Sequence, residues 1–149
     1  MIETKAPGRI CFFGDHQDYL TLPVIAGTID RFIKIKGKPN GKDYLQLKLI
    51  NFDSELKIDL KEPLKIIKKG DYLRSSIRVL NRNGIILNKG YDVEIKGDIP
   101  INAGLSSSSA LTVAWLRFLV KAALPENKFD DEQFARWAYE SEVLEFNEA

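Results

Sequence analysis

The sequence predicts an α+β fold, because runs with strand-like alternation are interspersed with runs that have helical spacing. Apolar and polar residues alternate with a period of two over residues 44–50 and 55–59. Apolar residues recur with helical spacing over residues 71–83 and again from about 130 to 145. A third helix-like run, residues 111–120, follows a loop rich in serine. We therefore expect a mixed domain of strands and helices.

The remaining strand-like segments complete the order of elements. Residues 2–14 predict one or two strands, broken at Pro7-Gly8, and residues 28–36 predict a strand after a hydrophobic turn. Residues 37–43 are typical of a turn between strands, and residues 91–96 predict a strand directly before the serine-rich loop. The length of 149 residues is enough for one domain with a substantial core.

Composition excludes several classes of protein. The 22 basic and 21 acidic residues nearly balance, and no basic stripe with interleaved aromatic residues predicts a nucleic-acid partner. No apolar run is long enough to span a membrane, and the N-terminus lacks a signal-peptide pattern. The single Cys11 excludes an internal disulfide, which favours a cytoplasmic location, and its apolar surroundings predict a core position.

The segment from Asp98 to Ala110, here called the serine loop, joins the strand at 91–96 to the following helix. Pro100 keeps the chain extended, and Gly104 permits a close backbone approach to a ligand. Four consecutive serines then stand at the start of a helix, whose free N–H groups and dipole favour an anion such as phosphate. The alternative is that the serines only cap the helix, but capping uses one or two. We therefore expect Gly104 and the serines from Ser106 to Ser109 to form an anion site.

A polar turn and a single glutamate are further candidates for a binding site. Asp15, His16 and Asp18 lie in a polar turn, and their oxygens and ring nitrogens suit a polyhydroxyl ligand. A solvated turn is an equal alternative, whereas a metal site is weaker because the chain has only one histidine. Glu142 stands beside a helical stripe formed by Phe134, Trp137, Ala138 and Ser141. It is either a surface carboxylate or a ligand for magnesium.

Two motifs resemble those of the GHMP kinases, a family that includes galactokinases and mevalonate kinases. Residues 100–110, PINAGLSSSSA, are similar to the family's phosphate loop, P-x-x-x-G-L-x-S-S-[SA]. Residues 6–19, APGRICFFGDHQDY, resemble the galactokinase motif A-P-G-R-V-N-L-I-G-E-H-T-D-Y. The resemblance implies a mixed or antiparallel sheet with helices on one face and a left-handed βαβ crossover. It also implies that the cofactors are ATP and Mg²⁺. The nucleotide-binding residues that it implies are Pro100, Asn102, Ala103, Gly104, Leu105, Ser106, Ser107, Ser108, Ser109 and Ala110.

The resemblance assigns a role to each matching residue. It implies that Arg9, otherwise read as a surface charge, is catalytic and lies near the transferred phosphate. It implies that Asp15, His16, Asp18 and Tyr19 bind the sugar, although Asp15 replaces the family's glutamate. Ser108 and Glu142 would hold the magnesium ion, with Ser107 as the alternative to Ser108.

The implied activity is ATP-dependent phosphorylation of a sugar hydroxyl, at the anomeric position in galactokinase-like members. The family's catalytic aspartate would fall a few residues past Ala149, and its C-terminal domain has no counterpart here. We therefore expect residues 1–149 to be an incomplete N-terminal domain, inactive by itself, whose partners are a sugar, ATP and the missing half of its own chain. The alternatives are a non-catalytic sugar sensor of the same fold, or a kinase for another alcohol such as mevalonate. The oligomeric state is not predicted.

Overall fold

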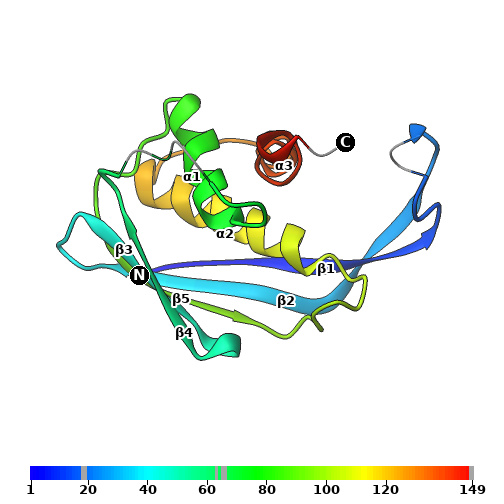
Figure 1. Ribbon diagram of the computed structural model, residues 1–149, viewed down its shortest axis with the longest axis horizontal. Helices are drawn as coiled ribbons and strands as arrows, with labels where there is room; N and C mark the ends of the chain where they lie inside the picture. Colours follow the sequence, from blue (N-terminus) through cyan, green and yellow to red (C-terminus); the bar gives the residue numbers. More distant parts are fainter. Residues whose placement is uncertain (18–19, 63, 65–66, 148–149) are drawn as a thin grey trace.

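A computed structural model describes residues 1–17, 20–62, 64 and 67–147. In these residues a five-stranded sheet carries three α-helices, and all of the helices lie over one face of it (Figure 1). The α+β prediction and the placement of the helices are thereby confirmed. The strands are β1 (Ile2–Phe13), β2 (Ile25–Pro39), β3 (Tyr44–Leu49), β4 (Ser54–Asp59) and β5 (Tyr91–Gly97), and the helices are α1 (Tyr72–Arg82), α2 (Ser107–Ala123) and α3 (Asp131–Glu142).

The sheet is mixed, with the strand order β1-β2-β5-β3-β4. Three neighbouring pairs are antiparallel, namely β1 with β2, β2 with β5, and β3 with β4. β3 and β5 are parallel, and the chain passes from one to the other through β4 and α1. The left-handed sense of this crossover stays a prediction.

β2 is longer than the sequence pattern predicts, and β1 is one continuous strand. β2 starts at Ile25 and ends at Pro39, so part of the expected turn at 37–43 is strand. β1 runs continuously past Pro7, but its pairing with β2 shifts register between Pro7 and Arg9. The core position expected for Cys11 is wrong, because the end of this hairpin extends beyond the helices and leaves its thiol half-buried (Figure 1).

The core lies between the sheet and α2. Trp115 and Phe118 of α2 are fully buried, and their rings stack at 5.4 Å between centroids. Gly37 of β2 faces the Phe118 ring so closely that an added Cβ would lie 2.5 Å from a ring carbon. The hydroxyl of Thr4 in β1 donates a hydrogen bond of 2.8 Å to the backbone carbonyl of Ala114. The helix is therefore fixed to the first two strands by both packing and hydrogen bonding.

The sequence places the starts of α1 and α3 well, because each has an aspartate cap. Asp71 accepts a hydrogen bond from the backbone N–H of Arg74, and Asp130 accepts one from that of Gln133. α3 is shorter than expected, since it ends at Glu142 and is followed by the 3-10 helix η3 (Leu144–Phe146). Within the described part of the chain, no helix has the length and apolar character needed to cross a bilayer.

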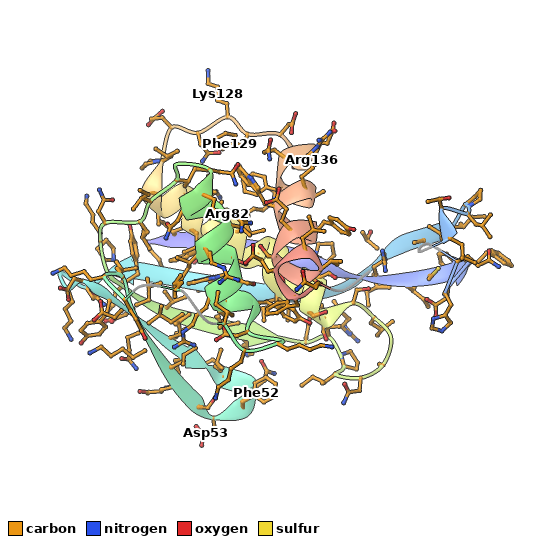
Figure 2. All side chains as sticks on the ribbon, turned by 45° about the horizontal axis from the view of Figure 1, so that its top comes forward. Phe52, Asp53, Arg82, Lys128, Phe129 and Arg136 are labelled. Atoms are coloured by element: carbon orange, nitrogen blue, oxygen red, sulfur yellow. The ribbon has the colours of Figure 1, made fainter. Side chains whose placement is uncertain are left out.

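The C-terminal end of the described chain is held by an ion-pair cluster. The carboxylate of Glu145 is almost fully buried and pairs with the guanidinium groups of Arg78 and Arg82 in α1. Figure 2 shows Arg82 on α1, where the side chains of the helical layer meet. These contacts fix η3 against α1, and η3 in turn follows directly from Glu142.

Candidate active site

The serine loop ends at the N-terminus of α2, as its composition predicts. α2 begins at Ser107, so the N–H groups of Ser107, Ser108 and Ser109 belong to its first turn and have no partner within the helix. Ser106 occupies the N-cap position but makes no side-chain capping hydrogen bond. Capping therefore does not explain why four serines are present.

The backbone of the serine loop adopts an uncommon conformation. Asn102, Gly104 and Ser106 have positive φ angles of 60°, 68° and 55°. Such a conformation is costly for residues other than glycine and is concentrated at functional sites. An added Cβ at Gly104 would meet nothing within 4 Å, so backbone conformation rather than space favours glycine there.

The serine loop packs directly on β1 beside Arg9. The backbone N–H of Arg9 donates a hydrogen bond of 3.0 Å to the carbonyl of Leu105. A Cβ on the neighbouring Gly8 would lie 2.9 Å from the same carbonyl oxygen, so a larger residue would force the loop away. Arg9 lines a cavity of about 190 Å³ together with Ser106 and Ser109. The predicted catalytic arginine and the serine loop therefore share one site.

Glu142 at the end of α3 faces the same site. The hydroxyl of Ser109 donates a hydrogen bond of 3.0 Å to a carboxylate oxygen of Glu142. The serine in contact is thus one position beyond Ser108, whose backbone carbonyl accepts a hydrogen bond from the hydroxyl of Thr112. Assignment of the metal to Ser108 and Glu142 stays a prediction, and the structure adds Ser109 as a neighbouring hydroxyl.

Burial raises the pKa of the Glu142 carboxyl above its ordinary value. Hydrogen bonds from Ser109 and Thr112 and the positive charge of Arg9 oppose this shift without cancelling it. A carboxylate that is buried without a full complement of partners is costly, and a bound cation would relieve that cost. Glu142 is therefore less solvated than a surface carboxylate, and its role as a magnesium ligand stays a prediction.

The raised pKa of Glu142 makes a prediction for stability. The folded state holds this proton more tightly than the unfolded state, so the free energy of unfolding falls as pH rises from the ordinary carboxyl pKa through the raised one. Glu142→Gln removes this contribution. Thermal unfolding of both proteins in metal-free buffer should show that the variant gains stability relative to the parent as pH rises. A difference in the free energy of unfolding between parent and variant that does not change with pH would contradict the raised pKa of Glu142.

The donor set suits magnesium more than a transition metal. In the described residues, no group of three or more His, Cys, Asp and Glu side chains is placed to hold a metal ion. Mg²⁺ commonly takes only one or two protein ligands and obtains its other oxygens from water and nucleotide phosphates. One carboxylate beside serine hydroxyls is consistent with that chemistry.

An apolar cavity of about 310 Å³ adjoins the serine loop, and no sequence motif indicated it. Ser107 and Ser108 line this cavity, so it opens directly onto the first turn of α2. Its other walls come from β2, β3, η2 (Ile50–Phe52), α1 and β5, which explains why no local pattern could reveal it. Figure 2 shows Phe52 at the β3–β4 turn, on its rim. The apolar side chains include Ile33, Leu49, Phe52, Tyr72, Leu73, Ile95, Ile99, Ile101 and Leu111.

Two of the predicted sugar-binding residues, Asp15 and His16, lie on the β1–β2 hairpin. Asp15 and His16 are in the connection between the two strands, and their side chains are 77% and 86% exposed. His16 has a positive φ of 67°, and its ring lies 3.7 Å from the Asp15 carboxylate. Asp18 and Tyr19 lie outside the described residues. The structure thus brings Arg9, the serine loop and Glu142 together, and it places Asp15 and His16 at the hairpin end.

A mixed sheet with helices on one face and a serine-rich loop at a helix N-terminus define a two-layer α+β domain. The GHMP kinases N terminal domain model matches residues 71–147, which include α1, β5, the serine loop and α3. The chain therefore belongs to the GHMP kinase family.

Curated relatives include galactokinases. The galactokinase of Thermococcus kodakarensis is 32% identical over 117 residues, which are 78% of this chain and 33% of that protein. The galactokinase of Chloroflexus aurantiacus is 31% identical over 112 residues, which are 74% of this chain and 28% of that protein. The chain thus spans about a third of the length of these relatives.

Solved structures share the fold over nearly the whole chain. A mevalonate kinase superposes with a TM-score of 0.85 at 23% identity, covering 100% of this chain and 48% of that one. The galactokinase of Lactococcus lactis complexed with galactose gives a TM-score of 0.82 at 25% identity, covering 94% of this chain and 37% of that one. These matches confirm the predicted GHMP kinase N-terminal fold.

Proposed function

We propose that this chain is the nucleotide- and sugar-binding N-terminal domain of an ATP-dependent sugar kinase related to galactokinases. The observation that carries the proposal is that Ser107 and Ser108 belong to both a cavity and a helix N-terminus. These residues line an apolar cavity of about 310 Å³ and also form the first turn of α2. A nucleotide needs this combination, because its base binds in an apolar pocket and its phosphates bind to free N–H groups.

In this proposal the serine loop binds the phosphates and the base enters the apolar cavity. Arg9 would stabilise negative charge at the transferred phosphoryl group, because it lines the separate cavity of about 190 Å³ next to Ser106. Glu142 and the serine hydroxyls would hold magnesium, which neutralises phosphate charge when bound. Asp15, His16, Asp18 and Tyr19 would orient the sugar, with its anomeric hydroxyl as the acceptor.

The chain spans only part of the galactokinases that it matches. The matched residues make up 33% and 28% of the two galactokinases compared above. The structural similarity to mevalonate kinase keeps one other substrate class, a non-sugar alcohol such as mevalonate, as the second candidate.

A matched pair of isoleucines tests the nucleotide site. Ile101 is 57% exposed on the rim of the apolar cavity, whereas Ile86 is 60% exposed in the connection between α1 and β5. Ile101→Asp should weaken binding of Mg²⁺-AMPPNP by about tenfold, or about 1.4 kcal/mol, because it brings a negative charge toward the base and phosphates. Titration calorimetry on the 149-residue chain measures this affinity. Ile86→Asp should leave it unchanged, and an equal loss in both variants would contradict the proposal.

The substrate class is tested with the full-length gene product. Consumption of ATP in the presence of galactose and other sugars, compared with mevalonate, identifies the acceptor. Turnover with a sugar supports the proposal, whereas turnover with mevalonate alone selects the second candidate. Binding of nucleotide without turnover of either class would indicate a sensor.

A further inference from the structure

A basic groove lies along the outer edge of β1, away from the candidate active site. A cavity of about 580 Å³ there is lined by five cationic side chains and a single carboxylate, that of Glu3. β1 is an edge strand, paired only with β2 in the described sheet. The cationic residues are Lys5 of β1, Lys34 and Lys36 of β2, and Arg117 and Lys121 of α2.

The charges on the outer face of the sheet are not arranged uniformly. One row across all five strands alternates in sign, because the register aligns Glu3, Lys36, Glu94, Lys48 and Glu55. The adjacent row consists of three lysines, since Lys5 lies opposite Lys34 and Lys34 lies opposite Lys96. Like charges directly opposite one another on a sheet are destabilising. The row formed by Lys5, Lys34 and Lys96 thus carries only positive charge, and it begins at the edge strand β1.

Few of these cations are neutralised within the described chain. Lys36 pairs with Glu3, and Arg117 pairs with Asp131. The ammonium of Lys5 lies 4.7 Å above the Phe32 ring, a contact that leaves its charge in place. In residues 1–17, 20–62, 64 and 67–147, Lys34 and Lys121 have no carboxylate within ion-pair distance. The groove thus offers positive charge from both the sheet and α2.

Pro7 indicates which backbone groups face the groove. Proline has no N–H to donate and occurs in strands where that position points away from the neighbouring strand. If the nitrogen of Pro7 points away from β2, the N–H and C=O groups of Glu3 and Lys5 point the same way. Alternate residues of a strand present these backbone groups to the same side. The free edge of β1 therefore offers backbone donors and acceptors between the lysines of the sheet and the cations of α2.

We propose that the free edge of β1 binds an extended acidic peptide segment of a partner protein by strand addition. Alternate side chains of an added strand point to opposite faces of the sheet. Acidic side chains on one face would meet the lysines of β1 and β2, and those on the other face would meet Arg117 and Lys121. Charge complementarity thus selects an acidic segment, and the backbone edge selects an extended one.

Binding of a synthetic peptide to the 149-residue chain tests the proposal. The probe is fluorescein-labelled Val-Glu-Glu-Thr-Val-Glu-Glu-Thr, measured by fluorescence anisotropy at near-physiological salt. A second peptide has the same sequence but N-methyl groups on alternate backbone amides, so that it keeps its charge and cannot pair as a strand. We expect saturable binding of the first peptide and a loss of about tenfold or more for the second.

Charge-matched variants locate the site. Lys34→Glu combined with Lys121→Glu should weaken peptide binding by about tenfold or more. Lys68→Glu combined with Lys89→Glu, at exposed positions outside the groove, should change it little. In the parent protein, peptide binding should also slow hydrogen exchange at the backbone amides of Glu3 and Lys5. Circular dichroism of both variants shows that the fold is retained.

Several outcomes would overturn the proposal. Equal affinity for the N-methylated peptide, an equal loss in both double variants, or equally tight binding of an oligonucleotide of the same charge would indicate diffuse attraction to the basic surface. A complete lack of binding would indicate that the lysines serve only to keep the edge of β1 from pairing with other strands.

Discussion

Replacing Trp115 with alanine is expected to lower the free energy of unfolding by about 3–5 kcal/mol. Trp115 is fully buried between the sheet and the helices, and its ring stacks on Phe118. Its indole N–H also donates a hydrogen bond of 3.0 Å to the carbonyl of Leu73 in α1. The substitution would therefore leave a large cavity and remove a link between α1 and α2. Domains of this kind are stable by only about 5–15 kcal/mol, so the loss is a large fraction.

Chemical unfolding measures this loss, and Trp137 provides a control. Trp137 is also buried, but its indole N–H has no hydrogen-bond partner in the described structure. Trp115→Phe removes ring volume and a hydrogen bond, whereas Trp137→Phe removes ring volume without a hydrogen bond. We expect the Trp115 variant to be the less stable by about 1 kcal/mol. A Trp115→Ala variant that unfolds within about 1 kcal/mol of the parent would contradict the described core.

Replacing Glu142 with glutamine is expected to weaken binding of Mg²⁺-AMPPNP by about tenfold or more, or about 1.4 kcal/mol. The carboxylate is half-buried at the end of α3 and accepts a hydrogen bond from Ser109, beside Arg9 and the serine loop. Glutamine keeps the size of the side chain but removes the charge that would bind the cation. Binding of AMPPNP without Mg²⁺ should not weaken, because the amide does not repel the phosphates.

Titration calorimetry with and without Mg²⁺ separates these effects. Glu132→Gln is the matched control, since Glu132 lies on the same helix and pairs with Arg136 on an exposed surface. Ser108→Ala and Ser109→Ala, measured in the same way, decide which hydroxyl supports the metal. An equal loss of affinity with and without Mg²⁺ would remove Glu142 from the metal site.

The sequence predicts those parts of the structure that depend on local patterns. The caps at Asp71 and Asp130 mark the starts of two helices, and the serine loop marks the start of α2. The apolar cavity could not be predicted in this way, because its walls come from segments far apart in the chain. Likewise, the run Ile10-Cys-Phe-Phe13 resembles a core strand by composition, but Phe12 and Phe13 are 60% and 70% exposed. Local hydrophobicity cannot show that a hairpin extends beyond its covering helices.

The family resemblance adds what local patterns lack. It identifies Arg9, the serine loop and Glu142 as parts of one site, and the structure brings these three together. The resemblance does not predict the contact between Ser109 and Glu142, because the motif allows serine or alanine at the position of Ser109. A difference of one position along the chain changes which serine hydroxyl faces Glu142, because neighbouring residues in the first turn of a helix point in different directions.

The hydrogen bond between Thr4 and Ala114 has a consequence for the order in which the nascent polypeptide acquires structure. As the chain leaves the ribosome, β1 and β2 emerge early, but the helix that covers them is translated only after most of the domain. Until then the inward side chains of that hairpin are exposed to water and to chaperones. We therefore expect ribosome-bound chains that stop before α2 to be sensitive to protease, and resistance to begin only once α2 has cleared the exit tunnel.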